Sequence, residues 1–193
     1  SHLLFSIKYL VQFAELNKFV NRYHFYITHT SFSKNDTKVS FMLRWTTPNN
    51  TLKRYSIIFV YDFIKKKLIR LPTDFMVSHY VWIEEKIIIY TRINNLDKHY
   101  ILDPIFPNEF EILDEKTLTS DGHQTCNPKG EIIVDTYPNS RRIQKLFYFK
   151  DIYSSGSLLG EFYHPKTFQT SNKRGHVCVD LHPRISTDGQ YVS

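Results

Sequence analysis

Residues 120–138 read SDGHQTCNPKGEIIVDTYP, and this stretch decides the fold. It places a histidine, His123, four residues before a polar turn at 127–130, and an apolar run at 132–134 follows the turn. Asn, Pro and Gly favour turns, whereas Ile and Val favour strands. The stretch therefore predicts two strands that run antiparallel and meet at a tight turn.

The same pattern occurs four times along the chain. Successive histidines of the pattern are 50, 44 and 59 residues apart. A propeller blade has four antiparallel strands in about 40–50 residues, so the spacing predicts one blade per repeat, with an insertion in the last interval. The four segments are His29-Thr-Ser-Phe32, His79-Tyr-Val-Trp82, His123-Gln-Thr-Cys126 and His182-Pro-Arg-Ile185.

The predicted fold is all-β: a β-propeller fragment of about three four-stranded blades plus the start of a fourth. Residues 1–25 form an N-terminal segment, either a short amphipathic helix or the end of a preceding blade. Residues 26–193 form the partial propeller, with blades that start near positions 26, 76, 120 and 179. The chain lacks an initiator Met and stops in a strand-like run, so we expect a fragment whose missing blades complete the propeller. The other strands are expected at 55–63, 67–71, 99–102, 110–113, 145–150 and 158–163.

Composition narrows the partners. The formal net charge is +6 and the sequence pI is about 9.2, which favours an anionic partner. The basic residues are dispersed and form no basic helix or RNA-binding signature, so we predict no nucleic acid partner. No apolar stretch approaches about 18 residues, so we predict no membrane span. The two cysteines make no CxxC pair and leave the compartment open, with a periplasmic or extracellular location favoured.

A polar residue recurs at a fixed distance from the start of the second strand in three repeats. Each of these side chains lies five positions after the first residue of that strand. If the histidine lies on the first strand and the second strand runs back antiparallel, the two side chains meet at one rim of the blade. The pairs that this register predicts are His29 with Arg44, His79 with Arg92, and His123 with Tyr137.

The repeats resemble a family, the bacterial TolB-like propellers with WD-type repeats that include oligogalacturonate lyases and other propeller proteins of polysaccharide gene clusters. The resemblance rests on THTSFSKNDTKVSFMLRW, MVSHYVW, SDGHQTCNPKGEIIVDTYP and DLHPRISTDGQYVS, whose turns look like versions of the family's Ser-Pro-Asp-Gly hairpin. It implies a propeller fold and a carbohydrate-active protein with an acidic polysaccharide or oligosaccharide as partner. A fold of this kind serves many functions, so the activity must come from the site itself.

Cleavage of a uronate-containing glycan by β-elimination needs a cation for the carboxylate, a base for the carbon-bound proton, and an acid for the leaving oxygen. Histidine titrates near neutrality, and arginine binds carboxylates with two donors. We therefore predict a lyase-like propeller. The candidates are His29, His79 and His123 as base or metal ligands, Arg44 and Arg92 for the uronate, and Tyr137 or Tyr80 as proton donor.

Imidazoles also bind divalent transition metals. The metal candidates in this sequence are His123 and His182, joined by Gln124 or His176. In oligogalacturonate lyases histidines and a glutamine hold a divalent metal, and the resemblance implies the same type of site here. The ion that we expect is Mn²⁺, Ca²⁺ or Zn²⁺.

Other interpretations of these residues stay open. The histidines can instead cap strands or bond a neighbouring blade, in which case the propeller is a non-catalytic module that binds a glycan or a protein. A glycoside hydrolase is a third possibility. Trp45 and Trp82 are more typical of blade packing than of sugar stacking. Cys126 occupies an apolar position of the repeat, which predicts a buried small side chain.

Overall fold

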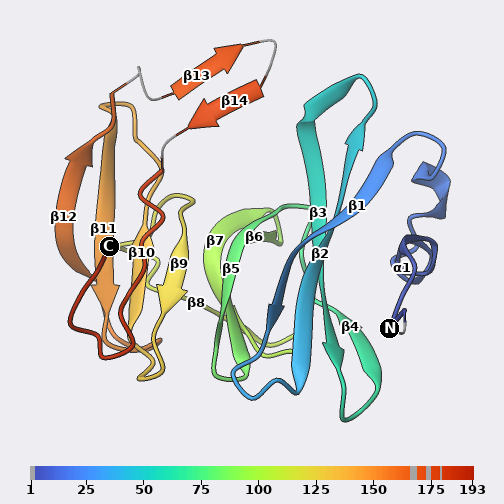
Figure 1. Ribbon diagram of the computed structural model, residues 1–193, viewed down its shortest axis with the longest axis horizontal. Helices are drawn as coiled ribbons and strands as arrows, with labels where there is room; N and C mark the ends of the chain where they lie inside the picture. Colours follow the sequence, from blue (N-terminus) through green and yellow to red (C-terminus); the bar gives the residue numbers. More distant parts are fainter. Residues whose placement is uncertain (1–2, 166–168, 173–174, 179) are drawn as a thin grey trace.

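The computed structural model describes residues 3–165, 169–172, 175–178 and 180–193; side chains at 50–52 and 166–179 lie outside that description. The fold is all-β, with one short α-helix and three four-stranded antiparallel sheets that follow one another along the chain. Figure 1 shows the three sheets side by side. Each of the three predicted repeats thus folds as one sheet.

The strands of each sheet are hydrogen-bonded in sequence order. Sheet A contains β1 (His24–Phe32), β2 (Lys38–Thr47), β3 (Asn50–Asp62) and β4 (Lys67–Arg70). Sheet B contains β5 (Val77–Ile83), β6 (Lys86–Ile93), β7 (Leu96–Leu102) and β8 (Phe110–Ile112). Sheet C contains β9 (Gln124–Cys126), β10 (Ile132–Asp135), β11 (Ile143–Phe149) and β12 (Ser157–Tyr163). A hairpin of β13 (Gln169–Asn172) and β14 (Gly175–Cys178) occupies the longest interval between histidines.

Sheet B is buried on both faces, which explains the uninterrupted apolar run in β6. Ile87 and Ile89 pack toward sheet A in a cluster with Met42. The intervening Ile88 points the other way and packs against Ile132 of sheet C. Successive side chains of a strand point to opposite faces, so a strand between two sheets must be apolar at every position.

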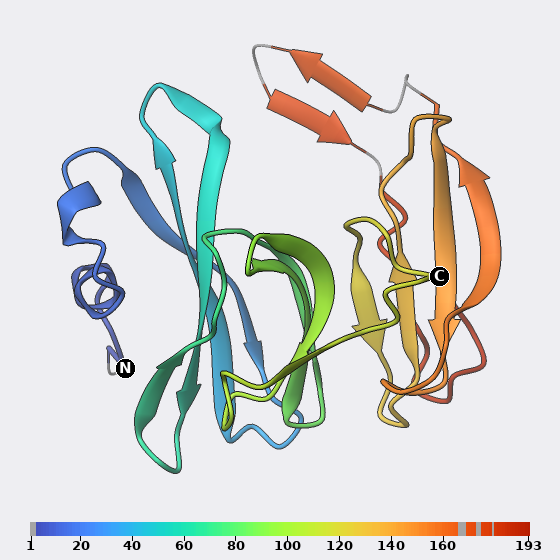
Figure 2. The ribbon, with the colours of Figure 1, turned by 180° about the vertical axis from the view of Figure 1, so that it is seen from behind.

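The N-terminal segment is a helix, α1 (Ile7–Phe13), followed by a 3₁₀ turn, η1 (Asn17–Phe19). Ser6 caps α1, because its Oγ accepts a hydrogen bond from the Tyr9 backbone N–H at 3.1 Å. Leu10 and Val11 pack on the outer face of sheet A. The helix therefore covers the side of sheet A that faces away from sheet B (Figure 2).

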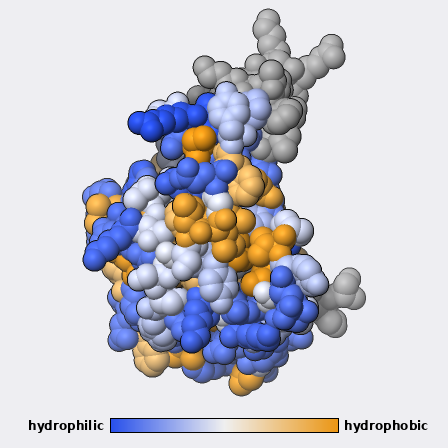
Figure 3. Space-filling view, turned by 90° about the vertical axis from the view of Figure 1, so that its left-hand side faces the viewer, coloured by the Kyte–Doolittle hydropathy of each residue, from blue (hydrophilic) through white to orange (hydrophobic). Residues whose placement is uncertain are grey.

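The opposite end of the molecule is less covered. On β12 all but one of the seven residues are exposed, including Leu158 and Leu159. Figure 3 views the molecule from this side and shows apolar surface between polar residues. The chain returns to this end after the β13–β14 hairpin, and an isolated bridge joins Ile185 to Val192. None of the helices in the described part of the chain has the length and apolarity that a membrane crossing requires.

Candidate metal centre and histidine rim

Three of the repeated histidines and a tyrosine gather at one rim of the sheets. The ring centroids of His123 and His182 are 3.6 Å apart, and those of His79 and His123 are 4.2 Å apart. The Tyr137 ring lies 5.5 Å from the His123 ring and 6.0 Å from the His79 ring. The structure therefore brings together side chains from the second, third and fourth repeats.

The histidines reach this rim because the backbone leaves regular strand geometry where they occur. The register of β1 with β2 shifts between Thr28 and Ser31, and His29 has a positive φ of 54°. The register of β5 with β6 shifts in the same way around His79. His182 lies outside a strand and has a φ of 47°. Irregularities of this kind redirect a side chain, and non-glycine residues with positive φ are uncommon.

Two carboxylates orient the imidazoles. Asp135 is 1% exposed, and its oxygens lie 3.0 and 3.1 Å from His123 Nδ1. It also accepts hydrogen bonds from the backbone N–H groups of His123, at 2.5 Å, and of His182, at 3.1 Å. Because an ionised carboxylate only accepts, His123 Nδ1 carries the hydrogen and the Nε2 lone pair faces away from Asp135.

Asp121 plays the corresponding part for His79. One carboxylate oxygen of Asp121 lies 3.4 Å from His79 Nδ1, and the other accepts a hydrogen bond from Ser78 Oγ at 2.5 Å. The Ser78 hydroxyl is also 3.0 Å from His79 Nδ1. His79 therefore presents Nε2 away from Asp121. Partners of this kind on Nδ1 are typical of metal-binding and catalytic histidines.

His123, Asp180 and His182 form a group that fits a divalent metal. Each offers one ligand atom, and these atoms lie within 4.8 Å of one another. Burial and the neighbouring His123 lower the pKa of His182, which favours the neutral imidazole that coordinates metals. Two nitrogens and a carboxylate oxygen suit Zn²⁺ or Mn²⁺ better than Ca²⁺, which prefers oxygen ligands.

Asp180 was not predicted as a ligand, although its place in the sequence indicates one. It lies two residues before His182, and residues two apart in an extended chain share a side. Asp121 and Asp135 were missed as well, because what they contribute depends on pairing between strands. Asp135 is the last residue of β10, and its backbone N–H donates to the carbonyl oxygen of His123 at 3.1 Å.

The other two predicted metal ligands differ from each other. Gln124 is turned toward sheet B, where its Nε2 lies 3.0 Å from His99 Nδ1 and donates to the Gly122 carbonyl oxygen at 3.1 Å. His99 is fully buried and its Nε2 lies 3.0 Å from the Ser120 carbonyl oxygen. This chain of contacts fixes the loop that carries Asp121 and His123. The side chain of His176 lies outside the described residues.

Positive charge lies on the sheet A side of the rim. Arg44 donates a hydrogen bond from Nη2 to the Ser78 carbonyl oxygen at 3.2 Å. Burial and, next, the neighbouring Arg54 lower the pKa of Arg44. Burial, followed by the charge of Arg44, lowers the pKa of His29 to about 4, although the side chain has one solvent-facing side. His29 is thus neutral near pH 7 and holds a proton weakly.

The Tyr80 hydroxyl and the Arg92 guanidinium are both engaged in hydrogen bonds. The Tyr80 hydroxyl donates to the backbone carbonyl of His29 and accepts from Ser40 Oγ at 3.1 Å, and burial raises its pKa to about 12. Arg92 forms a two-bond ion pair with Asp97, with Nε–Oδ1 at 2.6 Å and Nη2–Oδ2 at 2.9 Å. Arg44 and Arg92 therefore differ in surroundings despite their equal spacing in the sequence.

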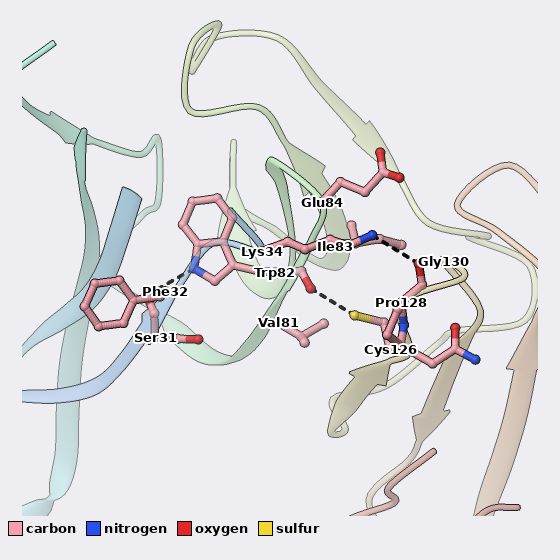
Figure 4. Close-up of a pocket in the computed structure, with 11 residues that line it drawn as sticks. Ser31, Phe32, Lys34, Val81, Trp82, Ile83, Glu84, Cys126, Pro128 and Gly130 are labelled. Atoms are coloured by element: carbon pink, nitrogen blue, oxygen red, sulfur yellow. Dashed lines mark hydrogen bonds between the residues drawn. The ribbon is translucent and has the colours of Figure 1, made fainter. Parts of the chain in front are cut away.

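A cavity of about 280 Å³ lies at the opposite, turn end of β1, β5 and β9, the first strand of each sheet. Its walls include Phe32, Trp82 and Cys126, and none of the repeated histidines (Figure 4). The Cys126 thiol donates to the Trp82 carbonyl oxygen at 2.9 Å. Trp82 is 6% exposed, as expected for packing, whereas Cys126 is only partly buried. The repeated histidines and this cavity are thus separate features.

Comparison with known proteins adds no relative: no protein-family model matches the chain, and no curated protein matches it. The resemblance to TolB-like propellers stays a prediction. What the chain does must be argued from the rim itself.

Proposed function

We propose that this chain is part of a β-propeller that cleaves a uronate-containing acidic glycan by β-elimination. The observation that carries the proposal is the convergence of His79, His123 and His182 at one rim, beside Asp180. Desolvation is costly for polar rings, so such a cluster at a rim is more typical of a functional site than of packing.

The propeller part of the proposal is supported by the order of the sheets. Each sheet has its four strands in sequence order, as a blade does. The first strand of sheet B, β5, contacts both β1 and β9, the first strands of its neighbours. First strands that contact one another are what a propeller requires around its central axis.

Each chemical part of a β-elimination has a candidate at this rim. Arg44 donates one hydrogen bond to the Ser78 carbonyl oxygen, and a guanidinium has five N–H donors, so donors remain for a uronate carboxylate. Tyr137 lies beside both His79 and His123 and is placed to protonate a leaving oxygen. A divalent ion held by His123, Asp180 and His182 would supply Lewis-acid neutralisation of the substrate carboxylate.

His79 is the better candidate for the base. Its Nδ1 faces the Asp121 carboxylate, which stabilises the positive charge that appears when Nε2 takes a proton. His29 lies beside a cation instead of a carboxylate, and burial together with Arg44 lowers its pKa to about 4. The position of Asp121 beside Nδ1 therefore favours His79 as the group that takes a proton from carbon. Asp121 and Asp135 are both engaged with histidines, which favours a lyase over a hydrolase that needs a free carboxylate pair.

The test is ultraviolet absorbance of the unsaturated uronate product. The protein is given polygalacturonate, alginate and hyaluronan, with and without a chelator. Rising absorbance that the chelator abolishes is the expected result. Glycan binding without any new absorbance would favour the non-catalytic binding module, and new reducing ends without absorbance would favour the hydrolase.

A further inference from the structure

A second hollow on sheet A is walled by five aromatic side chains. It encloses about 220 Å³ and is separate from the histidine cluster. The strands supply two of the walls, the N-terminal segment supplies two, and the loop after β4 supplies the fifth. We call it the aromatic pocket; its residues are Phe19, Tyr23, Trp45, Tyr55 and Phe75.

The rings are arranged as adjoining walls. Trp45 and Tyr55 are stacked, with centroids 5.7 Å apart and planes 18° apart. Phe75 meets Trp45 edge to face at 5.8 Å, and Tyr23 meets Tyr55 edge to face at 6.0 Å. Trp45 is 3% exposed and lies deepest, whereas Phe75 is 42% exposed and lies at the opening. Trp45 also stacks on Phe25, with centroids 5.6 Å apart, so its faces are covered and it forms the floor of the hollow. The stacking surface for a ligand comes from the rings nearer the opening, Phe75 above all.

Phe75 is held in a costly backbone conformation. Its φ is 56°, a region that a bulky side chain rarely adopts. The Phe75 carbonyl oxygen accepts a hydrogen bond from the Ser56 N–H at 3.0 Å, which fixes the loop against β3. Strain of this kind gathers at ligand-binding positions. Here its effect is to place an exposed ring over the pocket.

The charged side chains that contact the aromatic walls of the pocket are mainly positive. Lys18 Nζ lies 5.2 Å from the centre of the Phe19 ring, and Lys53 Nζ lies 5.7 Å from the centre of the Tyr55 ring. The Arg70 guanidinium lies 5.6 Å from the centre of the Phe75 ring. Glu15 is the acidic neighbour of Arg70. Three cations at the walls repel a cationic ligand and attract an anionic one.

We infer that the aromatic pocket binds one sugar ring of an acidic glycan, outside the reacting site. The C–H face of a pyranose packs on aromatic faces, and its carboxylate pairs with the cations at the wall. The volume is below the approximately 300–1,000 Å³ of pockets for larger ligands, which fits a single ring. The choice of a uronate as the sugar rests on the proposed function.

The position of the pocket agrees with this role. Trp45 is paired with Tyr55, and the adjacent pair is Arg44 with Ser56. The pocket and Arg44 therefore lie at the same end of sheet A. Side chains of adjacent strand residues point to opposite faces, so Trp45 faces the N-terminal segment while Arg44 faces sheet B. A glycan held in the pocket is anchored beside the rim without blocking it.

The test uses the fluorescence of Trp45. The chain has two tryptophans, so a Trp82→Phe background isolates Trp45. Trigalacturonate is titrated, with maltotriose as the neutral control and tetramethylammonium as the cationic control. We expect a saturable change with trigalacturonate only. Tyr55→Ala and the double variant Lys53→Gln, Arg70→Gln each weaken it about tenfold, whereas Tyr163→Ala on β12 does not. The double variant keeps every aromatic wall, so its result does not depend on the packing of Tyr55.

The outcomes separate this inference from the proposed function. In His123→Gln, turnover is lost while the Trp45 titration stays the same. A saturable titration with no turnover on any glycan would overturn the lyase and leave the pocket standing. Equal binding of maltotriose, binding of tetramethylammonium, or no titration at all would overturn the pocket even if turnover is observed.

Discussion

The two ends of β5 and β9, the first strands of sheets B and C, differ in chemistry although the same repeat encodes both strands. At the rim end the repeat places His79 and His123, which contact carboxylates and each other. Three residues later, at the turn end, it places Trp82 and Cys126, which line a largely apolar cavity. Three strand residues cover about 10 Å. In each repeat, the histidine at the rim and the apolar residue at the cavity are therefore about 10 Å apart along the strand.

The difference shows how each end satisfies its polar atoms. At the turn end the Trp82 Nε1–H donates inside the protein, to Ser40 Oγ at 2.8 Å and the Ser31 carbonyl oxygen at 3.2 Å. At the rim, Nδ1 of His79 and of His123 has a carboxylate partner, and Nε2 of each points away from it. A ring with one anchored nitrogen and one outward nitrogen is suited to a ligand or a proton.

The variant His123→Gln is the strongest test of the functional role of the rim end. Loss of this imidazole is expected to lower turnover about 10⁴-fold, which corresponds to about 5.5 kcal/mol. Mn²⁺ binding, measured by calorimetry, should be lost with it. His24→Gln, an exposed histidine at the start of β1, is the matched control and should retain both. Full turnover in His123→Gln would assign the rim histidines to structure.

Trp82→Ala tests the other end. Removal of this buried ring is expected to cost about 3–5 kcal/mol in the free energy of unfolding, measured with guanidinium chloride. Turnover per folded molecule should be nearly unchanged. Trp82→Phe, which keeps a ring, should cost less than half as much. A turnover loss as large as that of His123→Gln would mean that the two ends are coupled.

The buried residue His99 makes the free energy of unfolding depend on pH. Burial lowers its folded pKa from 6.5 to about 4, so between these values the unfolded chain binds a proton that the folded protein does not. The free energy of unfolding therefore falls as pH falls from 6.5 to 4, by up to roughly 3 kcal/mol from this residue. His99→Gln should flatten this slope. His29→Gln should flatten the slope as well, since the folded pKa of His29 is also lowered to about 4. His24→Gln, at the exposed start of β1, is the control that should leave the slope in place. An unchanged slope in His99→Gln would contradict the assignment.

The smallest expected effect compares two arginines. Arg44→Gln removes the cation beside the rim and should raise KM for polygalacturonate about tenfold, as one charged hydrogen bond is worth about 1.5 kcal/mol. Arg92→Gln removes an arginine that pairs with Asp97 and should leave KM unchanged. Equal effects on initial rates would mean that the charge acts at long range rather than by contact.

The two arginines also show where prediction from sequence reaches its limit. Both follow the start of a second strand by five positions, so the register gave them one role. Arg92, however, is the cross-strand partner of Asp97 around a turn at Asn94 and Asn95, where φ is 53° and 63°. Opposite charges facing each other across a hairpin form a pair. That hairpin was readable from the sequence, and it explains why Arg92 serves structure.

The carboxylates could not be found in the same way. Asp121 contacts His79 across 42 positions, and Asp135 reaches the N–H of His182 across 47. Neither contact follows from a local pattern, because each joins two different sheets or repeats. Gln124 shows the reverse: its sequence position beside His123 suggested a ligand, but strand alternation turns it toward His99.

The sequence by itself determined the four repeats, the all-β class and the three four-stranded sheets, because hydrophobic alternation and turn residues act over a few positions. It also placed histidines at the rim, since the repeat fixes them at one position of each unit. Which of them meet, which carboxylates contact them and which arginine pairs with a carboxylate followed only from the tertiary structure. These contacts depend on how one sheet packs on the next, because they join polar side chains that are far apart in the sequence.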